Sequence, residues 1–110
     1  MLTNRKLDEY CASIAQDIMA DVKSNERGMD DAYDMAHEYA DGSEYVIYYA
    51  KAHELCQNCD TDNGEDFLTG ISDQNVPRSY DDMAALIAYG EIHHRIYAAL
   101  SELEDEGEEQ

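Results

Sequence analysis

The chain is poor in basic residues. Its 110 residues include 7 Lys and Arg against 26 Asp and Glu, which gives a formal net charge of −19 at pH 7. This imbalance excludes nucleic acid as a direct ligand, because a phosphate backbone would be repelled rather than neutralised. The same argument about sign excludes binding to an anionic membrane surface.

Long apolar runs are also missing. No window approaches the roughly 18 apolar residues of a membrane span. The segment Met1–Lys6 leads into the chain without the apolar stretch of a signal peptide. Three cysteines, Cys11, Cys56 and Cys59, form an odd set, which fits reduced thiols better than a disulfide framework. These features predict a soluble, cytoplasmic protein.

Residues that interrupt helices are scarce, with one Pro and six Gly, and runs of β-branched residues are nearly absent. High net charge with few apolar residues usually leaves a chain disordered, but here 44% of the residues are apolar. Apolar residues recur instead at the i, i+3, i+4 spacing of one-faced helices. Composition and spacing together predict an all-α fold.

The spacing predicts three helices in the first half of the chain. The first covers residues 7–22, and the second covers residues 29–40. Ser43 is a candidate N-cap for a third helix over residues 44–57, because a serine hydroxyl can accept a bond from the first turn.

The second half is less regular at its start and more regular at its end. Residues 58–77 are rich in Asn, Asp, Thr and Gly, and within them a short helix is expected around residues 65–71. Ser79 is a candidate cap for the longest helix, which keeps its apolar spacing to about residue 103. We expect one domain over residues 1–104, a compact bundle of four to five helices, followed by a disordered acidic tail over residues 105–110.

Negative charge is unevenly placed along the chain. Residues 1–27 hold five acidic and four basic residues, whereas residues 28–110 hold 21 acidic and three basic residues. In the second predicted helix, acidic side chains recur every three or four residues opposite the apolar face, at Asp30, Asp34, Glu38 and Asp41. Like charges at i, i+4 weaken a helix by about 0.2–0.5 kcal/mol per pair. A sequence selected for stability alone would place Lys among them, so the stripe favours a functional reason.

The charge is comparable to that of a short stretch of DNA. Duplex DNA carries about one charge per 1.7 Å of axis, so 19 charges correspond to roughly 32 Å of duplex. Acids at i+4 on one helix are about 6 Å apart, which is too sparse to imitate a duplex. Several acidic helices on one surface would approach the required density, and a dimer would double the length to roughly 65 Å. The alternative is a surface that only keeps the protein soluble.

One string of residues has a composition typical of zinc ligands. His53, Cys56 and Cys59 are spaced as three ligands could be. Structural zinc usually takes four N or S ligands in two separated pairs, and no second pair follows at the usual distance. We therefore expect buried or half-buried thiols and no metal, and keep a small zinc module as an alternative. The fourth ligand in that alternative would be Asp60, His37 or Cys11.

Catalytic signals are weak. His93 and His94 are adjacent, so on a helix they point about 100° apart and cannot face one site. No nucleophile stands beside a base in a known motif, and no glycine-rich phosphate loop appears. The sequence predicts that the protein is not an enzyme and needs no cofactor.

Tyrosines supply nine of the ten aromatic side chains. Those at helical spacing are interpreted mainly as core or dimer packing. The alternative is a Tyr-rich face that binds a protein partner, which would make the chain an acidic adaptor. The tyrosines concerned are Tyr45, Tyr48, Tyr49, Tyr89 and Tyr97.

Several local patterns resemble the Ocr-like phage DNA-mimic antirestriction proteins. The resemblance rests on Asp31-Ala32-x-x-Met35-Ala36, on Tyr48-Tyr49-Ala50, and on Arg95-Ile96-Tyr97-x-x-Leu100 followed by an acidic C-terminal end. The patterns cover about two-thirds of the chain loosely, and their order and spacing matter more than any single one. The chain differs from that family in its nearly neutral first helix and its cysteine-bearing loop.

The resemblance implies an all-helical and dimeric protein whose carboxylates stand in for DNA phosphates. Such a protein would act in the cytoplasm of a phage-infected host. It would occupy the basic DNA-binding groove of a restriction–modification enzyme or a CRISPR-type complex and so inhibit it. The expected partner-binding residues are Asp30, Asp31, Asp34, Glu38, Asp41, Glu44, Asp62, Glu65, Asp66, Asp81, Asp82 and Glu91.

Overall fold

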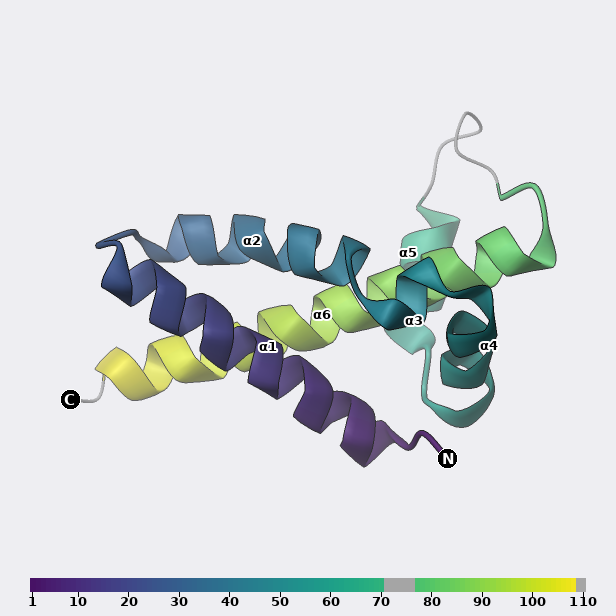
Figure 1. The fold of residues 1–110 in the computed structure, drawn as a ribbon, viewed down its shortest axis with the longest axis horizontal. Helices are drawn as coiled ribbons and strands as arrows, with labels where there is room; N and C mark the ends of the chain where they lie inside the picture. The colour runs from purple at the N-terminus through teal and green to yellow at the C-terminus, as the bar shows by residue number, and fades with distance from the viewer. Residues whose placement is uncertain (71–76, 109–110) are drawn as a thin grey trace.

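Helices account for nearly all of the regular structure. A computed structural model describes residues 1–70 and 77–108, and within these ranges the chain forms six α-helices and no strand (Figure 1). The prediction of an all-α fold is therefore confirmed, with six helices in place of four to five. The helices are α1 (Asn4–Ser24), α2 (Met29–Asp41), α3 (Glu44–Ile47), α4 (Tyr49–Asn58), α5 (Asp62–Thr69) and α6 (Tyr80–Glu108).

The long helix α6 organises the molecule. Figure 1 shows it running the length of the fold, and each of the other five helices packs against it. Its buried side chains include Ile92, Ile96 and Leu100, which meet Leu7 and Ile18 of α1 in the core. The four-residue recurrence of these buried positions explains why the helical spacing was readable from the sequence.

The third predicted helix is divided in two. Tyr48 has φ −102° and ψ 117°, an extended conformation that ends α3 and begins α4. The break lets two short helices contact α6 at different angles, where one continuous helix would follow a single line. This break accounts for most of the difference in helix number.

Two predicted caps are confirmed. The Tyr45 N–H donates to Ser43 Oγ at 3.3 Å, and the Asp82 N–H donates to Ser79 Oγ at 3.1 Å. The first helix begins earlier than expected, at Asn4, because Thr3 Oγ1 accepts the Lys6 N–H at 3.1 Å. Side-chain acceptors of this kind satisfy backbone donors that a helix leaves unpaired at its start.

The C-terminal end differs from the prediction. Residue 104 is not a boundary, because α6 continues without interruption to Glu108. A hydrogen bond of 3.1 Å from the Tyr33 hydroxyl to Glu104 ties this end to α2. The short helix expected around residues 65–71 is α5, which ends at Thr69, and Ile71 lies outside the described residues, as do residues 109 and 110.

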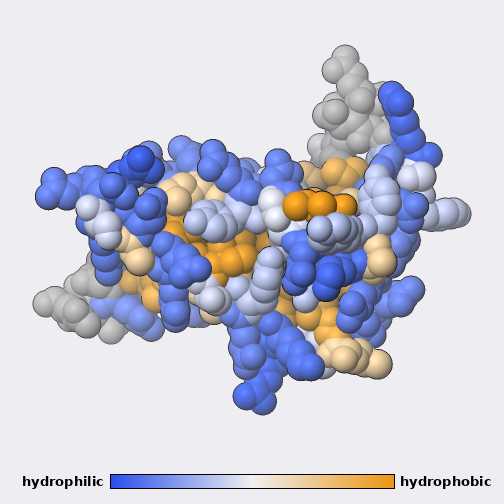
Figure 2. Space-filling view, viewed as in Figure 1, coloured by the Kyte–Doolittle hydropathy of each residue, from blue (hydrophilic) through white to orange (hydrophobic). Residues whose placement is uncertain are grey.

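None of the described helices is long and apolar enough to cross a membrane. Hydrophilic side chains line the edge formed by α2, while apolar side chains appear in the hollow between α1 and α2 and over α3 (Figure 2).

Candidate functional site

Helix α2 presents acidic side chains to solvent because its opposite face is buried. Ala32, Ala36 and Ala40 pack into the core at four-residue intervals, and these small side chains bring α2 close to α6. The predicted stripe therefore lies on the outer face. All four residues of the stripe are exposed, and Asp31 is a fifth exposed acid on the same helix.

The short helix α5 adds a second exposed acidic set, made of Asp62, Glu65 and Asp66. It is linked to α2 through Tyr89 of α6. The Tyr89 hydroxyl is 2.8 Å from His37 Nδ1 on α2, and its ring lies 5.3 Å from the ring of Phe67 on α5. Tyr89 therefore contacts both α2 and α5. We call the exposed carboxylates of α2 and α5 the acidic surface.

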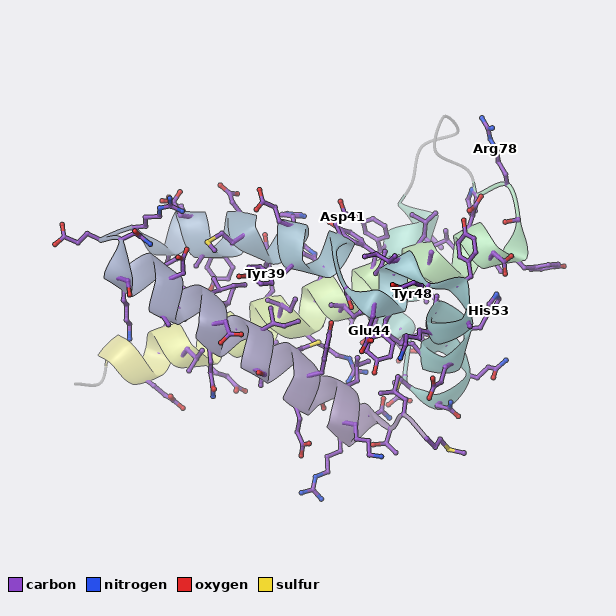
Figure 3. The ribbon with its side chains drawn as sticks, in the orientation of Figure 1. Tyr39, Asp41, Glu44, Tyr48, His53 and Arg78 are labelled. Carbon is purple, nitrogen blue, oxygen red and sulfur yellow. The ribbon has the colours of Figure 1, made fainter. Side chains whose placement is uncertain are left out.

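Carboxylates at the start of α6 have polar neighbours. Asp81 accepts a hydrogen bond from His53 Nε2 at 2.7 Å, and the half-buried Asp82 accepts one from the Tyr49 hydroxyl at 2.9 Å. The hydrogen bond and the charge of Asp82 raise the pKa of Tyr49. Glu44, labelled in Figure 3, lies at the start of α3. It forms an ion pair of 3.4 Å with Lys51. These three predicted residues are partly neutralised or engaged within the protein.

The prediction for Glu91 is wrong. Its side chain is 3% exposed and forms an ion pair of 3.0 Å with Arg95 one turn later. A carboxylate in this position cannot be presented to a partner. The sequence showed an acid on a helix, and only the packing of α5 against α6 shows that the acid faces inward.

No Lys or Arg lies within α2 or α5, although the exposed Arg27 stands three residues before Asp30. Arg5, Lys6 and Lys23 lie on α1, and Arg27 follows it. Beyond α2, Lys51 pairs with Glu44 and Arg95 is enclosed, so Arg78 alone is an exposed cation with no ion pair to a described residue. Figure 3 shows Arg78 pointing away from the helices. The acidic surface itself contains no ion pair between described residues.

The tyrosines divide into two groups. Tyr45, Tyr89 and Tyr97 pack against the core, as expected. Tyr48 and Tyr49 are 60% and 47% exposed at the junction of α3 and α4, so this pair does not pack in the core of the chain, and packing in a dimer remains a prediction for it. The extended backbone at Tyr48 turns both side chains outward, where a continuous helix would direct part of this segment inward.

The residues of the zinc alternative do not meet in one site. His53 is engaged with Asp81, and Cys56 Sγ lies 3.6 Å from the carbonyl oxygen of Ala84. Burial raises the pKa of both Cys56 and Cys59, which disfavours the thiolate that zinc binds. Within the described ranges, no group of three or more His, Cys, Asp or Glu side chains could hold a metal ion.

A row of ring side chains along α6 was missed by the sequence reasoning. Tyr89, His93 and Tyr97 recur at four-residue spacing and meet His37 of α2. The sequence-based interpretation treats His93 and His94 only as a candidate acid and base, and not as part of this row. The four-residue recurrence of rings was the signal available, and it indicates packing between helices.

The acidic surface thus consists of exposed carboxylates on helices that are held in place by packing against α6. Comparisons with protein-family models, with curated proteins and with solved structures found no match.

Proposed function

We propose that this chain is a DNA-mimic protein that inhibits a DNA-binding host defence enzyme, of the restriction–modification or CRISPR type. The acidic surface would occupy the groove that normally binds DNA. The observation that carries the proposal is the set of exposed carboxylates on α2 and α5 without compensating cations. The resemblance to Ocr-like proteins points in the same direction.

Fixed carboxylates suit this role better than flexible ones. The apolar face of α2 is anchored by three fully buried alanines, so its acidic side chains project from a rigid base. A partner that binds them does not have to order the backbone first, which removes one cost of association. A solubilising surface has no need for this rigidity or for the exclusion of cations.

The density of charge supports the comparison with DNA. The longest axis of the fold is 46 Å, so the 19 net charges of the whole chain, counted over all its faces, average about one per 2.4 Å (46 divided by 19), against about one per 1.7 Å in duplex DNA. A homodimer, which the resemblance implies, would extend the charged surface further. Light scattering of the purified protein measures whether it forms.

The mechanism would be competitive. Long-range attraction between a charged surface and a basic groove speeds their encounter. Once bound, carboxylates on a polypeptide offer the enzyme no phosphodiester bond to cut and no base to modify. Inhibition therefore needs no catalysis by this chain.

A displacement assay tests the proposal. A short fluorescent duplex is bound to a purified restriction–modification enzyme, or to a CRISPR effector complex, and the protein is titrated in at several salt concentrations. We expect the duplex to be displaced, with an inhibitor affinity that falls steeply as salt rises. Failure to displace DNA from enzymes of both types would contradict the proposal.

A matched pair of variants tests the location of the site. The variant D30N/D34N/E38Q/D41N removes the α2 stripe and changes the net charge from −19 to −15, since four carboxylates are neutralised. We expect the slope of log affinity against log salt concentration to become shallower by up to about 3.6, which is the B-DNA value of about 0.9 for each of four lost contacts. The control D17N/E26Q/E102Q/E106Q has the same net charge but alters exposed acids elsewhere. Equal losses in both variants would show that only total charge matters.

A second candidate function is favoured by the exposure of Tyr48 and Tyr49. Tyrosine is enriched at the centres of protein interfaces, so this junction would anchor a partner in an acidic adaptor. The adaptor predicts weak salt dependence and a large loss of binding in Y48A/Y49A. The DNA mimic predicts strong salt dependence and a small effect of the same change.

A further inference from the structure

Helix α5 begins without a cap from its own segment. Thr61, the residue before it, makes no side-chain hydrogen bond to the first turn. The backbone N–H of Gly64 instead donates to Glu91 Oε2 on α6 at 3.2 Å, and the Asn63 side-chain amide lies 3.5 Å from Glu91 Oε1. A carboxylate at a helix start satisfies an unpaired donor and interacts favourably with the helix dipole. Glu91 thus supplies from another helix what a cap residue normally supplies locally.

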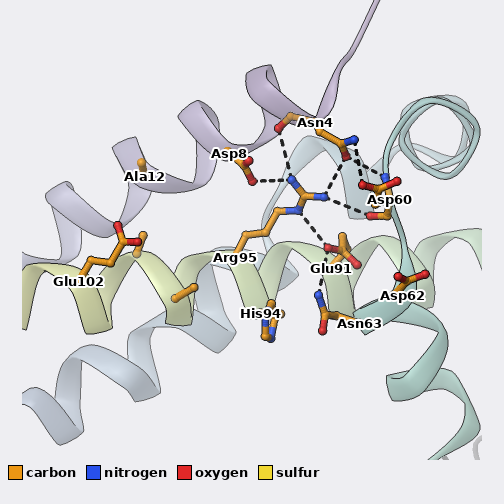
Figure 4. Close-up of a pocket in the computed structure, with 12 residues that line it drawn as sticks. Asn4, Asp8, Ala12, Asp60, Asp62, Asn63, Glu91, His94, Arg95 and Glu102 are labelled. Atoms are coloured by element: carbon orange, nitrogen blue, oxygen red, sulfur yellow. Dashed lines mark hydrogen bonds and ion pairs between the residues drawn. The ribbon is translucent and has the colours of Figure 1, made fainter.

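Arg95 fixes the position of that carboxylate. Its Nε–H donates to Glu91 Oε1 at 3.0 Å, and its side chain is only 11% exposed. The rest of the guanidinium reaches the start of α1 and the loop before α5, with hydrogen bonds to Asn4, Asp8 and the Asp60 carbonyl oxygen (Figure 4). Burial acts to lower the pKa of Arg95, but its bonds and charge interactions with Asp8 and Glu91 raise it overall. Arg95 therefore stays charged and joins three segments.

Helix α5 packs closely against α6 and depends on this packing for its order. A Cβ added at Gly64 would lie 2.3 Å from the Ile87 carbonyl oxygen, and one added at Gly90 would lie 2.8 Å from Phe67 Cβ. The two helices therefore touch backbone to backbone. An isolated helix of eight residues is not stable in water, so its order comes from contacts with α6.

We infer that Glu91 is a positioning residue for the acidic surface: it caps α5 from α6 and thereby holds the α5 carboxylates in place. The functional part of this inference rests on the proposed function. Glu91 contributes by ordering Glu65 and Asp66, which are exposed, and its own charge is balanced by Arg95. The sequence-based role of Glu91 as a contacting acid is replaced by a role inside the fold.

Hydrogen exchange on the free protein tests the capping role. In E91A we expect exchange of the α5 amides to rise about five- to tenfold relative to wild type, with α2 amides of the same molecule as the internal reference. The variant E91Q keeps an acceptor oxygen, so exchange of its α5 amides should rise less than in E91A. The control E102A changes an exposed glutamate on the same helix and should leave α5 unchanged. Exchange of α5 that stays within about twofold of wild type in E91A would overturn the inference.

A combined variant tests the functional part. E91A, E65Q/D66N and their combination are compared in the DNA-displacement assay. If Glu91 acts through α5, the combination loses less affinity than the product of the two separate losses. Independent, multiplicative losses would overturn the positioning role. A wild-type protein that displaces no DNA would overturn the proposed function, whereas the exchange experiment decides the capping role separately.

Discussion

His37 and His93 stack against each other with ring centroids 4.1 Å apart and an angle of 32° between the ring planes, which joins α2 to α6. Tyr89 lies parallel to His93 on one side, and Tyr97 packs at 4.3 Å on the other. His93 Nε2 is buried and has no hydrogen-bond partner among the described residues. A charged imidazole in this stack would be poorly solvated, and burial, with the charges of His37 and His94, lowers the pKa of His93 to about 4.

This pKa predicts a loss of stability in acid. The pKa of His93 is lower in the folded protein than its ordinary value of 6.5, so between these values the unfolded chain binds more protons. The free energy of unfolding should therefore fall as the pH drops from 6.5 to 4, by an amount on the order of 2–3 kcal/mol. Urea denaturation across this interval measures it.

The variant His93→Phe isolates this effect from the titration of the many carboxylates. Phenylalanine keeps a ring in the stack and cannot bind a proton. Its stability relative to wild type should rise as the pH falls through the interval. Parallel stability curves for the two proteins would contradict the assignment to His93.

The charge stripe on α2 predicts a gain in stability from a single lysine. Asp34 lies one turn from both Asp30 and Glu38, so D34K replaces two repulsive pairs by two attractive ones. We expect about 1 kcal/mol of added stability, equivalent to about 4 °C or more in the melting temperature. The control D34N removes the repulsion without adding an attraction, so it should give about half of this added stability. The proposed function predicts that D34K inhibits DNA binding less well, and a lower melting temperature would contradict the like-charge argument.

The contact between α5 and α6 predicts sensitivity to a single methyl group. Gly64→Ala would place its Cβ against the Ile87 carbonyl oxygen, a backbone atom of α6, so the clash is relieved only by shifting α5 and α6 apart. We expect destabilisation of about 1–3 kcal/mol by chemical denaturation. Gly70→Ala is the control, because its Cβ would lie 3.5 Å from the nearest atom, an ordinary contact. Equal effects of the two changes would show that the close approach is not important.

Local features of the fold were predictable from the sequence. Ser43 and Ser79 act as caps because capping depends on neighbours two or three residues away. The α2 stripe follows from the same local periodicity, since burial of its alanines fixes where the acids point. Such features can be predicted because the residues that determine them lie within one or two helical turns of each other.

Features that depend on contacts between distant segments were not predictable. Nothing near Tyr48 in the sequence marks a helix break, because the break is set by how α3 and α4 meet α6. The inward position of Glu91 depends on Gly64, which lies 27 residues away. The spacing of Glu91 and Arg95 at i, i+4 next to Gly90 was the available sign of an internal ion pair. It was indistinguishable from the many exposed pairs with that spacing.

The central position of α6 has a consequence for biosynthesis. Because the other five helices all pack on it, the segments made before it have no common surface to cover until residues 80–108 leave the ribosome. Earlier helices can form transiently, but their apolar faces stay exposed during translation. The helices that precede α6 therefore cannot complete their common core until α6 has been synthesised.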